Sequence, residues 1–317
     1  MTLPTRLPRL FYHRAKLCLG VVQYKALFLA ALVRNGFRSR YILSLPDSPS
    51  SQSALYKIAH RLGYRLTQDP HRHADIAIAW EDCTVRTKAA EVEAVAETRR
   101  VLNIRVADIG KQRVDEVFER TFGYGLRVDP EKHTGPLLRK SEANAQHDGQ
   151  ILEGPVRPEP GFAYQRLVQN YVGGLLQEVR VYVFGHSLPF GLLQRYPTKH
   201  RFTLEAGEAS LHETNELFSS TELEKLCRFC SEMGLDYGAI DVLRDSDDGR
   251  IYVVDVNNTP FGPVNRRLDD PPWFDATAWD GLNRMCDAFE RAFGVRTGLP
   301  DLRGSEDRGS GSRDGND

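Results

Sequence analysis

The sequence predicts two domains of different fold class, a small α/β domain over residues 1–108 and an antiparallel α+β domain over residues 109–297. The 317 residues exceed the length at which a single hydrophobic core stops growing. Before residue 109, short apolar runs alternate with helical stretches, which is typical of a partly parallel sheet; after it, strands follow one another directly. The segment 298–317 consists mainly of Gly, Ser, Asp and Arg, so we expect a disordered tail.

The composition excludes several classes of function. With 42 Lys and Arg against 43 Asp and Glu the net charge is −1, so no overall field attracts nucleic acid. Five cysteines, an odd number in a chain too large to need disulfides, predict reduced thiols and a cytoplasmic protein. Cys227 and Cys230 lack a second ligand pair for zinc and are expected to pack on a helix face. The apolar run 17–33 is interrupted by Gln23 and Lys25, which predicts a buried helix or strand–helix unit and no membrane span.

The first domain has a regular alternation of elements. The apolar patterns predict a strand at 41–45, a helix at 54–64, a strand at 75–81, a helix at 88–100 and a strand at 101–106. The polar segment 46–53 is expected to be a surface loop. No residue pattern in this domain indicates chemistry by itself.

The second domain begins with a helix and continues mainly as strands. The patterns predict a helix at 111–125, strands at 136–140, 150–155, 162–169 and 178–195, a helix at 221–234 and a hairpin at 237–257. A polar loop, 141–149, separates the first two strands. A last helix within 270–294 carries an apolar stripe, which predicts a docking face; the stripe consists of Trp279, Leu282, Cys286, Phe289 and Phe293.

The predicted hairpin is the most informative segment. Asp255 and Asn257 are two residues apart on a strand and therefore share one face. A three-residue turn over 247–249, with its glycine in the left-handed conformation, would place Asp241 directly opposite Asp255. These oxygens would meet on an otherwise apolar sheet, where unpaired carboxylates are costly. Such a set, with open positions, is expected of Mg²⁺ that also binds phosphate oxygens. The alternative is an ordinary hairpin with a charged, exposed face; the rigid NTPFGP turn that follows favours the metal site.

Basic side chains stand where they could reach phosphate. Arg180 lies in the middle of an apolar strand, so it needs either a salt bridge to Glu178 or another acid, or a phosphate group that suits its bidentate geometry. Lys140 ends an apolar strand and opens a polar loop, a position from which an ammonium group can reach into a cleft. Arg195 and Arg201 lie in the basic segment QRYPTKHRF, which is either a solvated loop or part of an anion site.

The segments of the second predicted domain, in their order along the chain, resemble those of the ATP-grasp superfamily. The hairpin, D-V-L-R-D followed by V-D-V-N-N-T-P-F-G-P, is similar to the end of that fold that holds Mg²⁺ against the ATP phosphates. LLRK resembles its strand with a phosphate-binding Lys, FAYQRLV its adenine-contacting hinge, and EVRVYVFG its strand with an Arg facing the triphosphate. The resemblance covers about residues 109–295. It implies a two-subdomain ATP-grasp fold with antiparallel sheets, preceded by a small α/β domain.

The resemblance also implies roles and cofactors. ATP and Mg²⁺ would be the cofactors. Lys111 would be an earlier nucleotide-binding Lys at the start of a helix. Adenine would contact backbone groups near Gln165 and Val168. Arg195 and Arg201 would join Arg180 near the γ-phosphate and an acyl phosphate.

The sequence departs from the family at two points. The loop 141–149 has one glycine, Gly149, where the family is commonly Gly-rich, so side chains of Ser141, Asn144 or His147 would replace backbone donors. Ala239 stands where D-alanine:D-alanine ligases have an Arg, so that substrate is not implied. The Arg180 strand is closer in arrangement to the glutathione synthetase and ribosomal-protein glutamate ligase branch, and sugar-transfer-associated ATP-grasp proteins are a further likeness.

The resulting hypothesis is an ATP- and Mg²⁺-dependent enzyme that activates a carboxylate as an acyl phosphate and joins it to an amine or similar nucleophile. The sequence has no nucleophile elbow and no P-loop, and this chemistry requires neither. A kinase that phosphorylates a small-molecule or sugar acceptor, and a nucleotide-binding module without turnover, are the alternatives. Small-molecule or peptide carboxylates and nucleophiles are the expected partners, and a homo-oligomer is left open.

Overall fold

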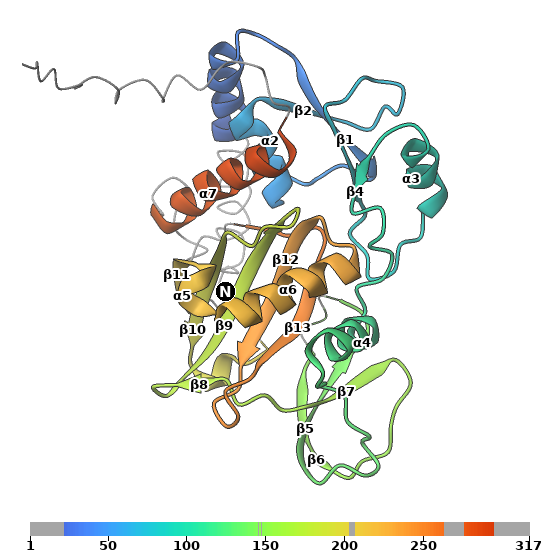
Figure 1. Cartoon of the computed structure of the whole chain (residues 1–317), viewed down its shortest axis with the longest axis vertical. Helices are drawn as coiled ribbons and strands as arrows, with labels where there is room; N and C mark the ends of the chain where they lie inside the picture. Colours follow the sequence, from blue (N-terminus) through green and yellow to red (C-terminus); the bar gives the residue numbers. More distant parts are fainter. Residues whose placement is uncertain (1–21, 145, 147, 203–206, 263–275, 295–317) are drawn as a thin grey trace, which may run out of the picture.

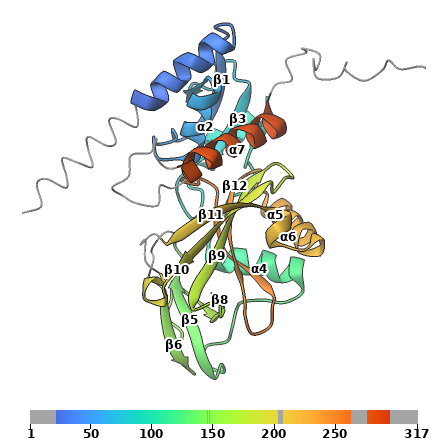
Figure 2. The same cartoon turned by 90° about the vertical axis from the view of Figure 1, so that its left-hand side faces the viewer.

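The structure, a computed structural model, describes residues 22–144, 146, 148–202, 207–262 and 276–294. Three sheets follow one another along the long axis of the molecule (Figure 1). A view turned by 90° shows β5 and β6 at the opposite end from β1 and β3 (Figure 2). The predicted disordered tail, 298–317, lies outside the described residues.

The N-terminal sheet confirms the predicted α/β class. Its four strands have the order β2-β1-β3-β4, and every pairing is parallel. The sequence 101–106 forms only a two-residue strand, shorter than predicted, because the chain turns at Asn103 (φ 59°). The elements are β1 (Arg40–Pro46), α2 (Ala54–Leu62), β2 (Tyr64–Thr67), β3 (Ile76–Trp80), α3 (Ala89–Ala96) and β4 (Val101–Leu102).

The apolar run near the N-terminus forms a helix over residues 22–34. A helix is one of the two predicted alternatives for this run. The prediction that it is buried is wrong for one of its faces. Tyr24 and Ala31, seven residues apart, are buried, whereas Leu29 and Val33 are 60% and 61% exposed. The helix packs through a single stripe, so the remaining apolar side chains stay in contact with solvent. Within the described residues, no helix has the length and apolarity that a membrane crossing requires.

The second domain confirms the predicted antiparallel architecture. A central sheet has the order β11-β10-β9-β12-β13, with β8 paired to β9, and a small sheet has the order β6-β5-β7; all of these pairings are antiparallel. The small-sheet strands are β5 (Gly135–Ser141), β6 (Gln150–Gly154) and β7 (Phe162–Arg166). The central strands are β8 (Tyr171–Val172), β9 (Leu175–Phe184), β10 (Phe190–Tyr196), β11 (Glu208–Glu213), β12 (Tyr237–Arg244) and β13 (Ile251–Asn257).

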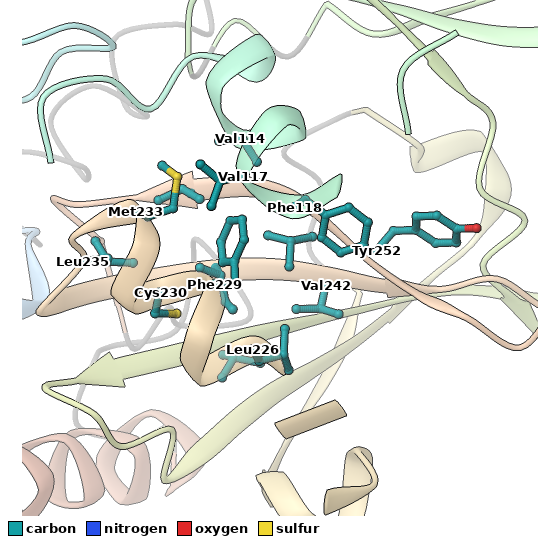
Figure 3. Close-up of a cluster of buried hydrophobic side chains, with 14 of the residues drawn as sticks. Val114, Val117, Phe118, Leu226, Phe229, Cys230, Met233, Leu235, Val242 and Tyr252 are labelled. Carbon is teal, nitrogen blue, oxygen red and sulfur yellow. The ribbon is translucent and has the colours of Figure 1, made fainter. Parts of the chain in front are cut away.

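Two helices cover one face of the central sheet. α4 (Lys111–Phe122) and α6 (Ser220–Met233) bury apolar side chains against β9, β12 and β13. Phe118 of α4 and Phe229 of α6 point into the same cluster (Figure 3), with ring centroids 6.5 Å apart. A capping box between Ser219 and Glu222 satisfies the first amides of α6. Cys230 is buried in this cluster, in agreement with the predicted packing role.

The last helix covers part of the opposite face of the central sheet. α7 (Ala276–Phe293) packs between β9 and α2, and so joins the central sheet to the N-terminal domain (Figure 1). Leu282, Cys286 and Phe289 of the predicted stripe are buried there. A short 3-10 helix, η1 (Thr198–His200), and α5 (Thr214–Leu217) complete the fold.

The hairpin β12–β13 has the predicted pairing but a different turn. Asp241 lies opposite Asp255, as predicted. The predicted three-residue turn is wrong, because the amide of Asp245 donates to the carbonyl of Arg250 (2.9 Å) and leaves a longer turn. The register shifts after Asp241, so that Val254 is an extra residue on β13. This bulge offsets the longer turn and restores the pairing of the two carboxylates.

Candidate active site

A cleft of about 390 Å³ lies between the small sheet and the central sheet. Its wall includes β5, β7, β9, β10, β12 and β13, together with the first residue of α4. Eight of the ten site residues that the sequence suggests line this cleft: Lys111, Lys140, Gln165, Val168, Arg180, Arg201, Asp241 and Asp255. The other two, Arg195 and Asn257, are not among its lining residues.

Arg180, Asp241 and Asp255 form a row across three neighbouring strands. Asp241 pairs with Arg180 on β9 and with Asp255 on β13. The Arg180 guanidinium donates from Nε and Nη2 to the two oxygens of Asp241, both at 2.8 Å. The acid that balances Arg180 is therefore Asp241, not Glu178. Asp241 raises the pKa of Arg180, which stays charged.

Lys111 contacts Asp255, and Lys140 contacts the preceding residue of β13. The buried Lys111 Nζ lies 2.8 Å from Asp255 Oδ1 and 2.9 Å from Asn144 Oδ1. Lys140 Nζ donates to the carbonyl of Val254 (3.0 Å), the extra residue of the bulge. Burial lowers the pKa of Lys140, and the charge of Asp255 opposes that shift. Two cations within reach of one carboxylate form a site that suits additional negative charge, such as phosphate.

Glu178 also lines this cleft, although the sequence patterns did not predict it as a site residue. It lies on β9 two residues before Arg180 and accepts a hydrogen bond from the Tyr196 hydroxyl (3.2 Å). Burial, and then the charge of Asp241, raise the pKa of Glu178 to about 7. Strand alternation could have indicated this residue, because residues two apart on β9 share a face. A carboxyl group with this pKa can take up or release a proton near neutral pH.

The two predicted arginines of the basic segment have different environments. Arg201 lines the cleft and donates to Asn170 Oδ1 (3.1 Å). Arg195 lies between Gln194 and Tyr196, which both line the cleft. Because side chains alternate along a strand, Arg195 points to the other face of β10.

The predicted metal ligands differ in how freely they face the cleft. Both oxygens of Asp241 accept from Arg180, and Oδ1 of Asp255 accepts from Lys111. Asn257 Oδ1 accepts the amide of Thr259 (3.0 Å). The described residues contain no cluster of three His, Cys, Asp or Glu side chains that could hold a metal alone. The oxygens still fit Mg²⁺, since a carboxylate has about four acceptor sites and Mg²⁺ commonly combines one or two carboxylates with water and phosphate.

Gln165 connects the cleft to a buried acid of α4. Its Nε2 donates to both oxygens of Asp115, at 2.7 and 2.8 Å. Leu138, which pairs with Gln165 across β5 and β7, lines the cleft together with Leu126 and Val168. An apolar slot with a few fixed polar groups is typical of a purine site.

Comparisons with known proteins decide the fold. No protein-family model and no curated protein matches the chain. The ATP-grasp ligase PsnB in complex with a minimal precursor matches with a TM-score of 0.52 and 17% identity, over 80% of this chain and 98% of that one. PsnB in complex with a minimal precursor, Mg and ADP matches with a TM-score of 0.50 and 15% identity, over 81% and 98%. The chain has the ATP-grasp fold.

In this ATP-grasp fold the loop between β5 and β6 is held by side chains. The amide of Asn144 donates to Thr84 Oγ1 of the N-terminal domain (2.7 Å), and its side chain accepts from Lys111. Glu142 accepts the amide of Gln112 (3.0 Å), near the N-terminus of α4. Asn144, one of the side chains predicted to replace backbone donors, thus contacts Lys111, the lysine that lies at Asp255. His147, named with it, lies outside the described residues.

Proposed function

We propose that this protein is an ATP- and Mg²⁺-dependent ligase that activates a carboxylate as an acyl phosphate and joins it to an amine or similar nucleophile. One observation carries the proposal: among the described residues, five cations and four carboxylates line one cleft of an ATP-grasp fold. They are Lys111, Lys140, Arg166, Arg180, Arg201, Asp148, Glu178, Asp241 and Asp255. The PsnB complex that contains a minimal precursor, Mg and ADP supports the use of a nucleotide and Mg²⁺.

The nucleotide would bind with its base in the slot near Gln165 and Val168 and its phosphates at Lys111 and Lys140. Asp241 of β12 and Asp255 of β13 would hold Mg²⁺. Asn257, which also lies on β13, would be a further oxygen ligand. Bound Mg²⁺ would neutralise phosphate charge and help to align the γ-phosphoryl group. Lys111, whose ammonium group contacts Asp255 in this structure, would supply a positive charge for a phosphate oxygen.

The chemistry would proceed in two steps. A carboxylate oxygen of the substrate attacks the γ-phosphorus, the bond to the β-phosphate oxygen breaks, and ADP leaves. The nucleophile then attacks the acyl carbon, its proton passes to Glu178, and inorganic phosphate leaves. Arg180 and Arg201 would stabilise the negative charge that both steps develop.

Trapping the intermediate tests this proposal. We expect the protein, given ATP, Mg²⁺, hydroxylamine and pools of carboxylates or carboxylate-bearing peptides, to form a hydroxamate with matching ADP release. Hydroxylamine reacts with an acyl phosphate but not with a stable phosphate ester. ATP binding without turnover in any pool would contradict the ligase and support a nucleotide-binding module.

Phosphorylation of a hydroxyl acceptor is the second candidate, and Glu178 is the observation that favours it. A hydroxyl acceptor needs a general base, and a carboxyl group with a pKa of about 7 in the cleft can serve as one. In the same assay a kinase would give ADP and a stable phosphorylated product without hydroxamate.

Replacing Glu178 by Gln is expected to lower kcat by roughly a hundredfold, because the base that accepts the proton is removed. The Kd for ATP should change by no more than about twofold, since a neutral amide keeps the shape of the side chain. Steady-state kinetics and calorimetric ATP binding measure both quantities. Glu208→Gln, at an exposed position on β11 of the same sheet, is the matched control and should behave like the unaltered protein. An unchanged kcat in Glu178→Gln would remove this carboxyl group from the mechanism.

A further inference from the structure

We propose that the helix at residues 22–34 binds the surface of a lipid bilayer that contains anionic phospholipids. This part of the N-terminal domain takes no part in the proposed ligase chemistry. The helix, drawn in dark blue, lies at the end of the molecule opposite β5 and β6 (Figure 2). A membrane held at this helix would therefore leave the cleft beside the small sheet accessible.

One side of the helix exposes an apolar stripe. Val22, Leu29 and Val33 are each more than half exposed, and their spacing of seven and four residues places them on one side of the helix. Phe37, just beyond the helix, is 69% exposed and has a φ of 58°, which is uncommon for a large side chain. Single exposed apolar residues are common on protein surfaces, whereas a stripe of them marks an interaction site.

Cations without salt bridges flank the apolar stripe. The helical period places Lys25 on one side of the stripe and Arg34 on the other; both are exposed, as is Arg38. In the described part of the chain none of these three side chains forms a salt bridge, whereas Arg40 pairs with Glu290. Long basic side chains can keep their charge among lipid headgroups while apolar neighbours enter the bilayer.

The charges of the chain are segregated along the sequence. Residues 1–46 contain eight Lys and Arg residues and no Asp or Glu, although the whole chain has 42 basic and 43 acidic residues. The near-neutral total is therefore the sum of a strongly basic N-terminal segment and an acidic remainder. A basic segment that carries an exposed apolar helix face is typical of proteins that bind an anionic membrane surface.

A cavity of about 500 Å³ opens beside the same helix. Its apolar lining includes Phe28, Leu29 and Leu66, and Lys25 and Arg65 also line it. The Arg65 guanidinium lies over the Phe28 ring, 5.6 Å from the ring centroid. Apolar walls with cations beside them suit a phospholipid, which has an acyl chain for the walls and a phosphate for the cations.

The apolar stripe favours a membrane over the other partners of a basic surface. Nucleic acid phosphates would pair with the cations but would leave Val22, Leu29 and Val33 without an apolar partner. A second copy of the helix would bury the stripe but would bring the basic flanks of two helices together, and like charges repel. An anionic bilayer offers both an apolar interior and a negative surface.

Sedimentation of the full-length protein with lipid vesicles tests the inference. We expect at least about tenfold tighter binding to phosphatidylcholine vesicles with about 30% phosphatidylglycerol than to phosphatidylcholine alone. Raising NaCl from about 0.1 to about 0.5 M should weaken that binding, because it shortens the range of the electrostatic attraction. The assay contains no ATP, so its result does not depend on ligase activity.

Removing the apolar stripe tests the insertion into the bilayer. Leu29→Ser with Val33→Ser should weaken binding to the anionic vesicles by at least about tenfold, because two apolar side chains are lost from the contact. Both positions face solvent, so the melting temperature should change little. Ile151→Ser with Val172→Ser, exposed apolar positions on β6 and β8, is the matched control and should bind like the unaltered protein.

Removing the flanking charges tests the attraction to anionic lipid. Lys25→Gln with Arg34→Gln and Arg38→Gln should weaken binding by about fivefold per charge and reduce its dependence on salt. No binding to anionic vesicles, or equal binding by the stripe variant and the unaltered protein, overturns the inference. A dimer in light scattering that Leu29→Ser with Val33→Ser converts to a monomer, without vesicle binding, would assign the stripe to a second copy instead. Binding to duplex DNA without vesicle binding would assign the cations to nucleic acid.

Discussion

Asp255→Asn is expected to reduce ATP-dependent turnover by at least roughly a hundredfold while the protein stays folded. Asp255 faces the cleft at one end of the charged row, opposite Asp241, and contacts Lys111 at 2.8 Å. The substitution keeps the shape of the side chain but removes the negative charge that would hold Mg²⁺ against the phosphates. Two lysines then lie in the cleft without this carboxylate, so the proposed metal is repelled as well as deprived of a ligand. ADP release at several Mg²⁺ concentrations, together with the melting temperature, measures the effect.

The matched control for this prediction is Asp247→Asn. Asp247 lies in the exposed turn of the same hairpin, outside the cleft lining. It should leave turnover unchanged. Undiminished turnover in Asp255→Asn would reject the metal assignment, and an equal loss in both variants would show that the hairpin as a whole, not the charge at Asp255, had been affected.

Arg180→Met is expected to lower the free energy of unfolding by about 3 kcal/mol, because it leaves Asp241 as an unpaired carboxylate in a largely buried position. It is also expected to abolish turnover, because it removes a cation that would stabilise the negative charge developed in both steps. The Arg180 and Asp241 side chains are 22% and 12% exposed, and the guanidinium makes both of its hydrogen bonds at 2.8 Å. Urea unfolding and steady-state kinetics measure the two effects.

A second substitution separates the stability effect from the catalytic effect. Arg180→Met with Asp241→Leu removes both charges, so most of the lost stability should return, whereas turnover should stay absent. Arg195→Met, on the other face of the same sheet, should change stability by less than about 0.5 kcal/mol and leave turnover intact. A double variant no more stable than Arg180→Met would show that the ion pair is not the source of the destabilisation. Turnover in the double variant would remove both residues from the chemistry.

The sequence by itself was sufficient for features that depend on local periodicity. Alternation along β13 placed Asp255 and Asn257 on one face, and hairpin geometry brought Asp241 to Asp255, although the turn and the bulge differ from the expected form. The apolar stripe of α7 likewise predicted a buried docking face. Side chains two apart on a strand, or three to four apart on a helix, share a face whatever the rest of the chain does.

Only the tertiary structure decided which distant groups meet. Arg180 and Asp241 are 61 residues apart, and Lys111 and Asp255 are 144 apart. Their contacts depend on β9 lying beside β12 and on α4 starting next to β13, and no local pattern specifies such neighbours. The pairing of β10 with β9 likewise decided that Arg195 faces away from the cleft.

The protonation of the cleft groups has the same origin. The pKa values of Glu178 and Asp115 are raised chiefly because burial removes their carboxyl groups from water. The sequence supplies the charges and their faces, whereas desolvation and pairing arise only when the sheets close around the cleft.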